Sequence, residues 1–385
     1  MKILFFDFGA YTYDDVLDCF ERAGIESRTV SYCFSDKNND DFFIHRFSKF
    51  LKEDKYDAVF SVNFFPLVAR CCYRENIKYI SWSYDNPLNV PGIEKTLGLS
   101  CNYVFLFDRI QVEGYLRQGF DNVYHLPLAA NVRRLDQIRL SALEHKRFDS
   151  EISFVGKLYD SEFDGYMKLL SQRQRGFVEG INSLQQNLYG CYILDELIDE
   201  KRVNEINAYI KSVHPETSFE LSPEALTYAM SARITRDERL LLLGLLSGKH
   251  QLKLYTREQN EILSKAECMG SCGYLEEMPR IFKASKININ ITLKMLQSGI
   301  PLRGMDIMGA GGFLLSNYQP ELAEFFEDGR EMVMYESVED AVAKADFYLK
   351  NDVLRMEIAS RGHQKVSEEF SYESAFKKIF DTAKI

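Results

Sequence analysis

The sequence predicts an α/β protein with two doubly wound, Rossmann-like halves, each a parallel sheet between layers of helices. Three observations support this prediction. Short apolar segments alternate with amphipathic helical segments over residues 1–130, and a second alternating series begins at Glu151–Gly156. Such alternation is typical of parallel sheets with right-handed crossovers. A chain of 385 residues is also too long for one ordinary hydrophobic core, which favours two domains.

The first half should contain six strands, because it holds six short runs rich in β-branched and aromatic residues. They span Ile3–Phe8, Ser27–Tyr32, Ala58–Val62, Tyr79–Trp82, Val104–Phe107 and Val123–Leu126. Helices are expected between them; in Asp14–Ala23, for example, Val16, Leu17 and Phe20 recur at helical spacing. Parallel sheets bind ligands at the carboxyl ends of their strands, so the residues just after these runs are candidates for a site.

The second half is expected to carry a helical insertion and a strand–loop–helix–strand–helix unit. Helical patterns predominate over about residues 163–246, where strand signals are few. Strands resume at Gln251–Tyr255, the unit follows over residues 286–330, and helical segments fill Val338–Ile385. We therefore expect an N-terminal domain over residues 1–140, a C-terminal domain over residues 141–370 and a final helix over residues 371–385.

The unit over residues 286–330 has the form of an anion-binding site. Its strand, loop and short helix are expected at Ile287–Thr292, residues 298–301 and Arg303–Met308. The loop holds Ser298 and Gly299, and the helix that follows begins at the end of a parallel sheet. Orphan N–H groups and the helix dipole favour phosphate at such an N-terminus, with Arg303 as an adjacent cation. Asp306 lies about one turn further on, where a carboxylate can reach a ribose hydroxyl. The unit therefore predicts a nucleotide diphosphate site.

A distinctive run follows this helix: GGFLLSNYQPELAEFFEDGREMVMY, then SVEDAVAKADFYLKND and the tail RGHQKVSEEFSYESAFKKIF. From about residue 285 to the C-terminus the chain resembles the nucleotide-sugar half of GT-B glycosyltransferases. It is most similar to the group 1 type and its CgeB-like (spore-maturation-type) branch. Over residues 1–284 the likeness lies mainly in layout. The wider family carries two glutamates eight positions apart; Asp306 takes the second position, and Ser298 stands at the first.

The resemblance implies a GT-B fold, in which two Rossmann-like domains face a cleft and the last helix crosses back to the first domain. It also implies transfer of a sugar from a nucleotide diphosphate donor to an acceptor hydroxyl or similar group. Lys157 follows the first strand of the second half, where related enzymes place a basic residue against the diphosphate; the alternative is a solvated surface lysine. Tyr274 resembles the turn before the helix that covers the base, where the backbone contacts the base.

Acceptor chemistry is expected in the first domain, at strand ends. Asp85 lies in SWSYDNP, beside Trp82 and Tyr84, and a carboxylate there can act as acceptor ligand or general base. The alternative is an Asx-type turn before Pro87. His125 is a second candidate for acid–base chemistry, or else a structural histidine. Gly9, after the first strand, lets a ligand approach closely or serves as a turn glycine.

Composition limits the partners and the compartment. A net charge of −10 argues against nucleic-acid binding, which requires a basic surface. No apolar run approaches the ~20 residues that span a bilayer, and the start of the chain lacks a signal-peptide cleavage site. The eight scattered cysteines fit reduced, buried thiols in a cytoplasmic protein better than disulfides. No Asp-x-Asp motif occurs, so we expect neither a metal nor another cofactor, with the phosphates stabilised by N–H groups and cations.

Two classes of function therefore remain. The favoured hypothesis is a glycosyltransferase whose donor is a nucleotide sugar and whose acceptor is a glycan, a protein or a small molecule. The rival is a protein of the same shape that binds a nucleotide or glycan without transferring sugar, because fold alone does not decide function. A nucleotide-sugar epimerase of the same fold is a further alternative. Turnover of a nucleotide-sugar panel distinguishes the first two.

Overall fold

The computed structural model describes residues 1–34, 36–86, 88 and 92–385. Their contacts divide the chain into two compact units. Unit 1 comprises Met1–Leu135, Ser298–Gly309 and Gln364–Ile385, and unit 2 comprises Asp136–Gln297 and Ala310–His363. The segment Ser298–Gly309, which we expected in the C-terminal domain, thus has most of its contacts in unit 1.

Unit 1 is built on a six-stranded parallel sheet with strand order β2-β1-β3-β4-β5-β6. The strands are β1 (Lys2–Asp7), β2 (Glu26–Ser31), β3 (Ala58–Val62), β4 (Lys78–Ser83), β5 (Asn102–Leu106) and β6 (Val123–His125). All six predicted strands are confirmed, with ends shifted by at most two residues. The strand order reverses between β1 and β3, and in doubly wound sheets that reversal opens a crevice at the carboxyl edge.

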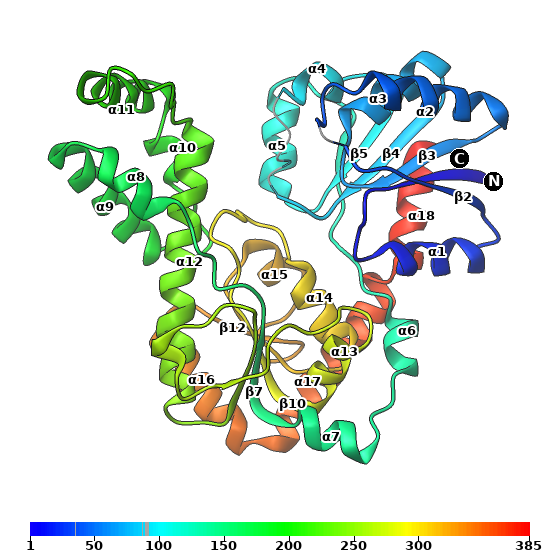
Figure 1. The fold of residues 1–385 in the computed structure, drawn as a ribbon. Helices are drawn as coiled ribbons and strands as arrows, with labels where there is room; N and C mark the ends of the chain where they lie inside the picture. The colour runs from blue at the N-terminus through cyan, green and yellow to red at the C-terminus, as the bar shows by residue number, and fades with distance from the viewer. Residues whose placement is uncertain (35, 87, 89–91) are drawn as a thin grey trace. The chain divides into compact units, whose positions relative to one another are not determined.

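Helices cover both faces of this sheet. The helices grouped with unit 1 are α1 (Tyr13–Arg22), α2 (Asp41–Glu53), α3 (Pro66–Glu75), α4 (Glu94–Leu97), α5 (Arg109–Arg117), α14 (Leu302–Gly309) and α18 (Tyr372–Ala383), with α6 (Val132–Gln137) at the boundary of the unit. Figure 1 shows α2 and α3 on one face and α1 with α18 on the other. Phenylalanines fill both interfaces: Phe6 of β1 packs against Phe43 and Phe47 of α2, and Phe60 of β3 packs against Phe20 of α1 and Phe376 of α18.

Unit 2 contains a second six-stranded parallel sheet, with strand order β12-β11-β10-β7-β8-β9. Its strands are β7 (Ser150–Val155), β8 (Leu252–Tyr255), β9 (Glu267–Cys268), β10 (Ser285–Asn290), β11 (Leu314–Asn317) and β12 (Val333–Tyr335). From β7 the strands run in one direction to β8 and β9, and from β10 they run in the other direction to β11 and β12. Strands β7 and β10 are neighbours at the centre of the sheet. The order therefore reverses between them, as in the Rossmann fold, and the loops after β7 and β10 flank the crevice.

The remaining helices of unit 2 pack on this sheet or form the predicted insertion. They are α7 (Ala142–Phe148), α8 (Phe163–Leu169), α9 (Gln172–Gln186), α10 (Leu194–Leu197), α11 (Glu200–Val213), α12 (Pro223–Ser247), the short 3₁₀ helix η1 (Glu261–Leu263), α13 (Glu277–Ala284), α15 (Pro320–Phe325), α16 (Val338–Lys350) and α17 (Asp352–Glu369). Helices α8 to α11 and the first half of α12 share their own apolar core. The second half of α12 joins the core of the sheet through Leu242, Leu243 and Leu246.

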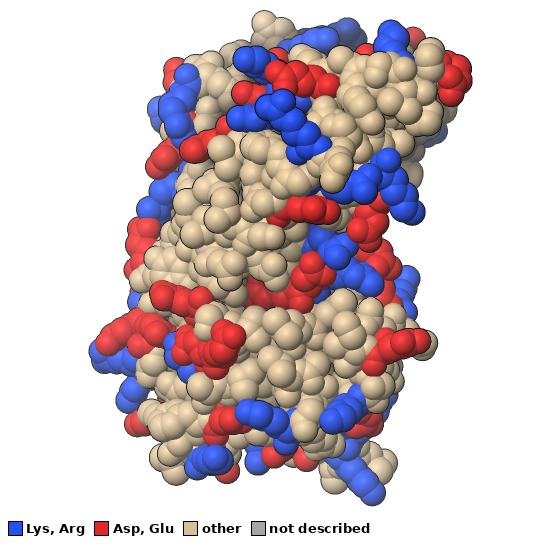
Figure 2. Space-filling model, turned by 90° about the vertical axis from the view of Figure 1, so that its left-hand side faces the viewer, with Lys and Arg blue, Asp and Glu red and all other residues tan. Residues whose placement is uncertain are grey.

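Three surface features complete the fold. Acidic and basic side chains of the described residues are interspersed on the face drawn in Figure 2. Among the described helices, none combines the length and the apolarity needed to cross a bilayer. All eight cysteines are free, but the expectation that they are buried is wrong for Cys33, Cys191 and Cys268, which are exposed because each lies in a loop or at a sheet edge.

Candidate functional site

Two loops at the carboxyl edge of the unit 1 sheet, after β1 and after β4, hold Gly9 and Asp85. After β1, the carboxylate of Asp7 accepts hydrogen bonds from the N–H groups of Gly9 (2.9 Å) and Ala10 (3.1 Å). Gly9 has a φ of +87°, which favours glycine, and no heavy atom lies within 4 Å of the position a Cβ would take. The turn by itself therefore accounts for glycine here, and the space in front of it is open.

Asp85 is exposed and is held by one residue of the loop after β3. Asn63, with a φ of +67°, donates from its Nδ2 to the Asp85 carboxylate at 2.7 Å. The Asn63 Oδ1 accepts hydrogen bonds from the backbone N–H groups of Tyr84 (2.8 Å) and Asp85 (3.2 Å). These three hydrogen bonds from Asn63, in the loop after β3, fix the loop after β4. The Asp85 carboxylate is therefore oriented although it is exposed. Pro87, on which the predicted turn depended, lies outside the described residues.

Tyr84 connects this edge to Asp306. Its hydroxyl lies 2.9 Å from the hydroxyl of Tyr372, at the start of α18. Burial raises the pKa of Tyr84, and the negative charges of Asp15 and Asp306 act in the same direction. Asp306 is 7% exposed in α14, so its carboxylate belongs to the buried polar groups of unit 1. Asp306 therefore acts through space on Tyr84, the residue next to Asp85 in the sequence.

The loop before α14 is bound by a carboxylate of unit 1. Asp108, fully buried at the start of α5, accepts hydrogen bonds from the N–H of Ser298 (3.0 Å), the hydroxyl of Ser298 (3.0 Å) and the N–H of Gly299 (3.3 Å). A Cβ at Gly299 would lie 2.7 Å from the carbonyl oxygen of Phe107, so only glycine allows this approach. The two N–H groups that we expected to face phosphate therefore face Asp108, and an anion would have to displace this carboxylate to reach them.

The other two predicted residues of unit 1 are half-buried. Arg303 lies in the first turn of α14, and His125 ends β6, where it pairs in register with Leu106 of β5. Each has further interactions with its surroundings. At this end of α14 the N–H of Gly304 already donates to the carbonyl oxygen of Pro301 at 2.9 Å, and an anion site beside Arg303 stays a prediction.

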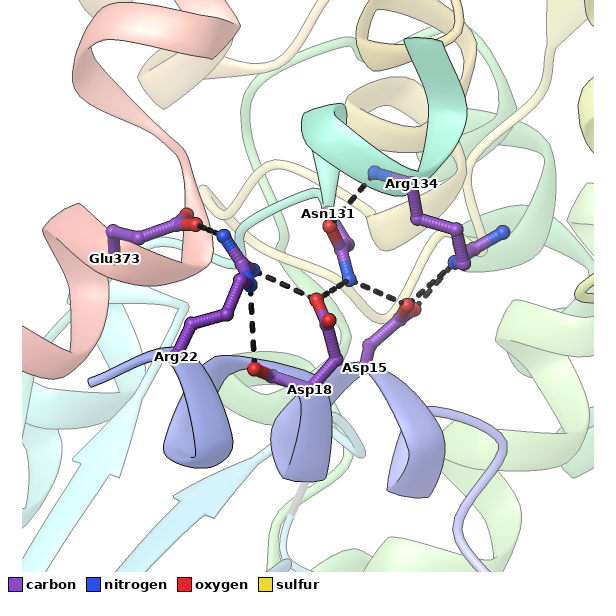
Figure 3. A network of polar contacts seen from close by, with 6 residues as sticks. All are labelled: Asp15, Asp18, Arg22, Asn131, Arg134 and Glu373. Atoms are coloured by element: carbon purple, nitrogen blue, oxygen red, sulfur yellow. Dashed lines mark hydrogen bonds and ion pairs between the residues drawn. The ribbon is translucent and has the colours of Figure 1, made fainter. Parts of the chain in front are cut away.

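A polar network ties α1 to two distant segments of unit 1 (Figure 3). The buried carboxylate of Asp15 accepts from Arg134 at 2.6 Å and from Asn131 at 3.0 Å. Asp18 accepts from Asn131 at 3.0 Å, and Arg22 joins Asp18 to Glu373 of α18. Two arginines bridge the three carboxylates, so this network anchors the crossover after β6 and the last helix to α1.

In unit 2, the loops at the sheet's reversal point are joined by Arg239 of α12. Its guanidinium donates to the carbonyl oxygen of Lys157, after β7, and to that of Ile291, after β10. It also stacks over the rings of Phe154 and Tyr159, with its Cζ 5.1 and 4.6 Å from their centroids. Lys157 itself is exposed, with its backbone fixed by this bridge.

Tyr274 occupies the turn before α13, as expected, and is half-buried. Within the turn, the Gly273 N–H donates to the Glu277 carboxylate at 3.0 Å, and the Glu277 N–H donates back to the Gly273 carbonyl. Among the described residues, no group of three or more His, Cys, Asp or Glu side chains is arranged to hold a metal ion.

A pocket that the sequence did not predict lies at the carboxyl edge of β10 and β11 in unit 2. We call it the Lys294 pocket; it is lined by Leu188, Tyr189, Gly190, Cys191, Tyr192, Lys294, Leu296, Gln297, Asn317, Tyr318 and Gln319. Its walls come from the loop after α9, the loop after β10 and the loop after β11. Gly190, with a φ of +69°, lets the first of these loops pass close to Tyr318, whose ring would lie 2.4 Å from a Cβ at that position.

Helix α12 supports this pocket through a buried polar stripe. Ser231 lies 3.1 Å from the hydroxyl of Tyr192, and Thr235 accepts from the backbone N–H of Lys294 at 2.9 Å. Glu238 accepts from the hydroxyls of Tyr189 (3.0 Å) and Tyr335 (3.2 Å). The signal was present in the sequence, because Thr227, Ser231, Thr235 and Glu238 recur at helical spacing within an apolar helix.

Comparison with known proteins agrees with this fold. Residues 249–381 match the family model described as glycosyl transferase-like. The sequence has no significant match among curated proteins. Among solved structures, the chain is similar to a glycosyltransferase from Rickettsia africae ESF-5 (TM-score 0.56, 11% identity), covering 100% of this chain and 97% of that one.

Two further structures show the same architecture over the full length. Sucrose-phosphate synthase from Thermosynechococcus elongatus has a TM-score of 0.59 at 9% identity, covering 100% of this chain and 98% of that one. Anabaena Alr3699/HepE, solved in complex with UDP and glucose, has a TM-score of 0.53 at 10% identity, covering 100% and 99%. At these identities the similarity establishes the fold. Together, the family match and the shared fold support a glycosyltransferase of the GT-B type.

Proposed function

We propose that this protein transfers a sugar from a nucleotide diphosphate donor to an acceptor hydroxyl or similar group, as a member of the CgeB-like branch. The observation that carries the proposal is the family match over residues 249–381, which includes the β10–α14–β11 unit with Arg303 and Asp306. The structural neighbour HepE has been solved with UDP and with UDP-glucose, which supports a nucleotide sugar as donor.

The proposed donor contacts exclude the two N–H groups that Asp108 binds. Arg303 and the N-terminal amides of α14 stabilise the diphosphate, because both present positive charge. Asp306 binds a ribose hydroxyl, Lys157 contacts the diphosphate, and backbone groups around Tyr274 contact the base. The reaction is proposed to be metal-independent, with these cations and dipoles in place of a metal.

The proposed acceptor chemistry centres on Asp85. Its carboxylate is exposed yet held by Asn63, so it can accept a proton from an acceptor hydroxyl or orient that hydroxyl. Gly9 leaves open space at the same edge of the sheet. His125 is the second candidate for proton transfer. The eight free cysteines are consistent with a reducing compartment, and we propose the cytoplasm.

Calorimetric titration tests the donor site. The nucleoside diphosphate UDP should bind the wild-type chain and bind more weakly to Arg303→Ala and Asp306→Ala. Asp340→Ala is a matched control, because Asp340 is a helical carboxylate of α16 outside the proposed site. Equal UDP affinity in all four proteins would remove the donor site from α14. A chelator that abolishes transfer, with magnesium or manganese restoring it, would overturn metal independence.

Two alternatives are distinguished by the products. A protein that only binds would retain UDP affinity and leave every nucleotide sugar intact. An epimerase would change the sugar without any acceptor. Transfer of the sugar supports the glycosyltransferase. Slow hydrolysis to the nucleoside diphosphate and a free sugar supports it as well, provided that the sugar keeps its configuration at every carbon other than the anomeric one.

A further inference from the structure

Lys294 is a buried cation without a neighbouring counter-ion. Its side chain is 9% exposed, and among the described residues it forms no ion pair within 4.0 Å. Its Nζ lies 4.1 Å from the centroid of the Tyr189 ring, so the ammonium rests against an aromatic face. A buried charge is costly unless it is paired or hydrogen-bonded. The Lys294 pocket thus carries a positive charge at its wall that no close ion pair compensates among the described residues.

Glu238, the carboxylate that acts on Lys294 through space, is hydrogen-bonded to other side chains. Glu238 receives the hydroxyls of Tyr189 and Tyr335 on the same oxygen, Oε1. Burial lowers the pKa of Lys294, and the charge of Glu238 opposes this shift without forming an ion pair. Glu238 therefore offsets part of the cost of the buried ammonium through space, while the donor positions of the ammonium stay available to a ligand.

A second polar group of the pocket also lacks a partner. The Oε1 atom of Gln319, at the start of α15, is buried and has no hydrogen-bond partner among the residues that the structure describes. Buried amide oxygens are nearly always hydrogen-bonded, so an orphan at a pocket wall indicates a missing donor. Lys294 and Gln319 belong to the loops after β10 and β11, at the edge where parallel sheets bind their ligands.

We infer that the Lys294 pocket binds a small molecule through a phosphate or carboxylate group, with Lys294 as counter-ion and Gln319 as acceptor for a neighbouring hydroxyl. The loop Leu188–Tyr192, which belongs to the helical insertion, forms one wall of the site. The ring of Tyr189 in this loop contacts the ammonium of Lys294. This assignment stands on unit 2 alone and does not depend on sugar transfer.

Cys191 provides a reporter at the rim of the pocket. It is free and exposed and lines the site, while Cys33 and Cys268 are free and exposed but do not line it. The experiment measures the rate of alkylation of each thiol by N-ethylmaleimide, resolved by peptide mass spectrometry. The probes are inorganic phosphate and D-glucuronate, with D-glucose as the neutral control.

Phosphate, glucuronate or both should slow alkylation of Cys191 about tenfold at about ten times the Kd, and leave Cys33 and Cys268 unchanged. Protection by phosphate alone or by glucuronate alone identifies the anionic group. Lys294→Met should abolish the protection, whereas Lys286→Met, at an exposed position of β10, should retain it. The inference is overturned if neither anion protects Cys191, if glucose protects it equally, or if protection survives in Lys294→Met. The measurement on the wild-type chain decides the first two outcomes even if Lys294→Met does not fold.

Discussion

Replacing Asp108 with alanine should destabilise unit 1 far more than the loss of an ordinary helix cap. The Asp108 carboxylate accepts the N–H of Gln111 (3.2 Å), as a cap does, and also the three donors of Ser298 and Gly299. Hydrogen bonds to a charged acceptor contribute about 1.5–3 kcal/mol each, without full additivity. We therefore expect Asp108→Ala to lower the free energy of unfolding by about 3–6 kcal/mol, because it leaves buried N–H groups of the loop before α14 without an acceptor.

The assay uses the one tryptophan of the chain, Trp82, which is fully buried in β4 of unit 1. Its fluorescence during urea denaturation reports the unfolding of this unit. The control is Asp40→Ala, which removes the cap of α2 in the same unit together with the hydrogen bond from the Tyr32 hydroxyl, and should cost about 1–2 kcal/mol. If Asp108→Ala destabilised unit 1 no more than Asp40→Ala, the bridge from Asp108 to the loop would contribute nothing and the reasoning would be refuted.

Three further predictions concern Gly190 of unit 2, the pH dependence of the stability that Asp346 contributes, and the proposed role of Asp85. Gly190→Ala should destabilise unit 2 by about 1–3 kcal/mol and speed alkylation of Cys191, because the new Cβ meets Tyr318 at a left-handed φ; Gly176→Ala in α9, with open space around it, should do neither. The hydrogen bond from His250 lowers the pKa of Asp346, so its stabilising effect is present above about pH 4 and is lost as the pH falls through the folded pKa. The stability difference between wild type and Asp346→Asn should accordingly shrink in acid; a constant difference from pH 7 to pH 2 would contradict this. Asp85→Asn should reduce turnover about 10²–10⁴-fold and leave UDP affinity unchanged, and wild-type turnover would return the role of base to His125.

The sheets of both units could be predicted because their signals are local. Each strand of unit 1 is a short apolar run followed by an amphipathic helix, and period-2 and period-3.6 patterns need no tertiary information. The alternation of isoleucine with asparagine in β10 has a clear physical cause. Ile287 and Ile289 enter the core beneath α12 and α16, while Asn288 on the opposite face donates to the carbonyl of Phe282 and accepts from Ser153.

The use of the loop at Ser298 and Gly299 could not be predicted, because its partner lies 190 residues away in the sequence. Small residues before a helix favour any acceptor for their N–H groups, whether phosphate or carboxylate. The small residues before the helix indicated that their N–H groups need an acceptor. Only the fold showed that the acceptor is Asp108. No local pattern indicated that Ser298–Gly309 would group with unit 1.

The Lys294 pocket was missed for a related reason. A single lysine after a strand belongs to no repeating pattern that would mark it as buried. The ring that Lys294 contacts, Tyr189, comes from the helical insertion, which is distant in the sequence. The only local signal was the polar stripe of α12, in which Thr227, Ser231, Thr235 and Glu238 lie on one face. A polar stripe inside an apolar helix indicates buried hydrogen-bond partners, so helices of this kind are the places to search for sites that motifs do not mark.

Turnover of a nucleotide-sugar panel tests the central claim most directly. The purified chain is incubated with UDP-, GDP-, ADP- and dTDP-sugars, and NMR follows the phosphorus and anomeric proton signals against a no-protein blank. We predict that at least one donor is converted to its nucleoside diphosphate and free or transferred sugar, and that Asp306→Ala slows this conversion. Binding of a donor with no conversion of any member of the panel would contradict a glycosyltransferase and favour a protein that only binds nucleotides.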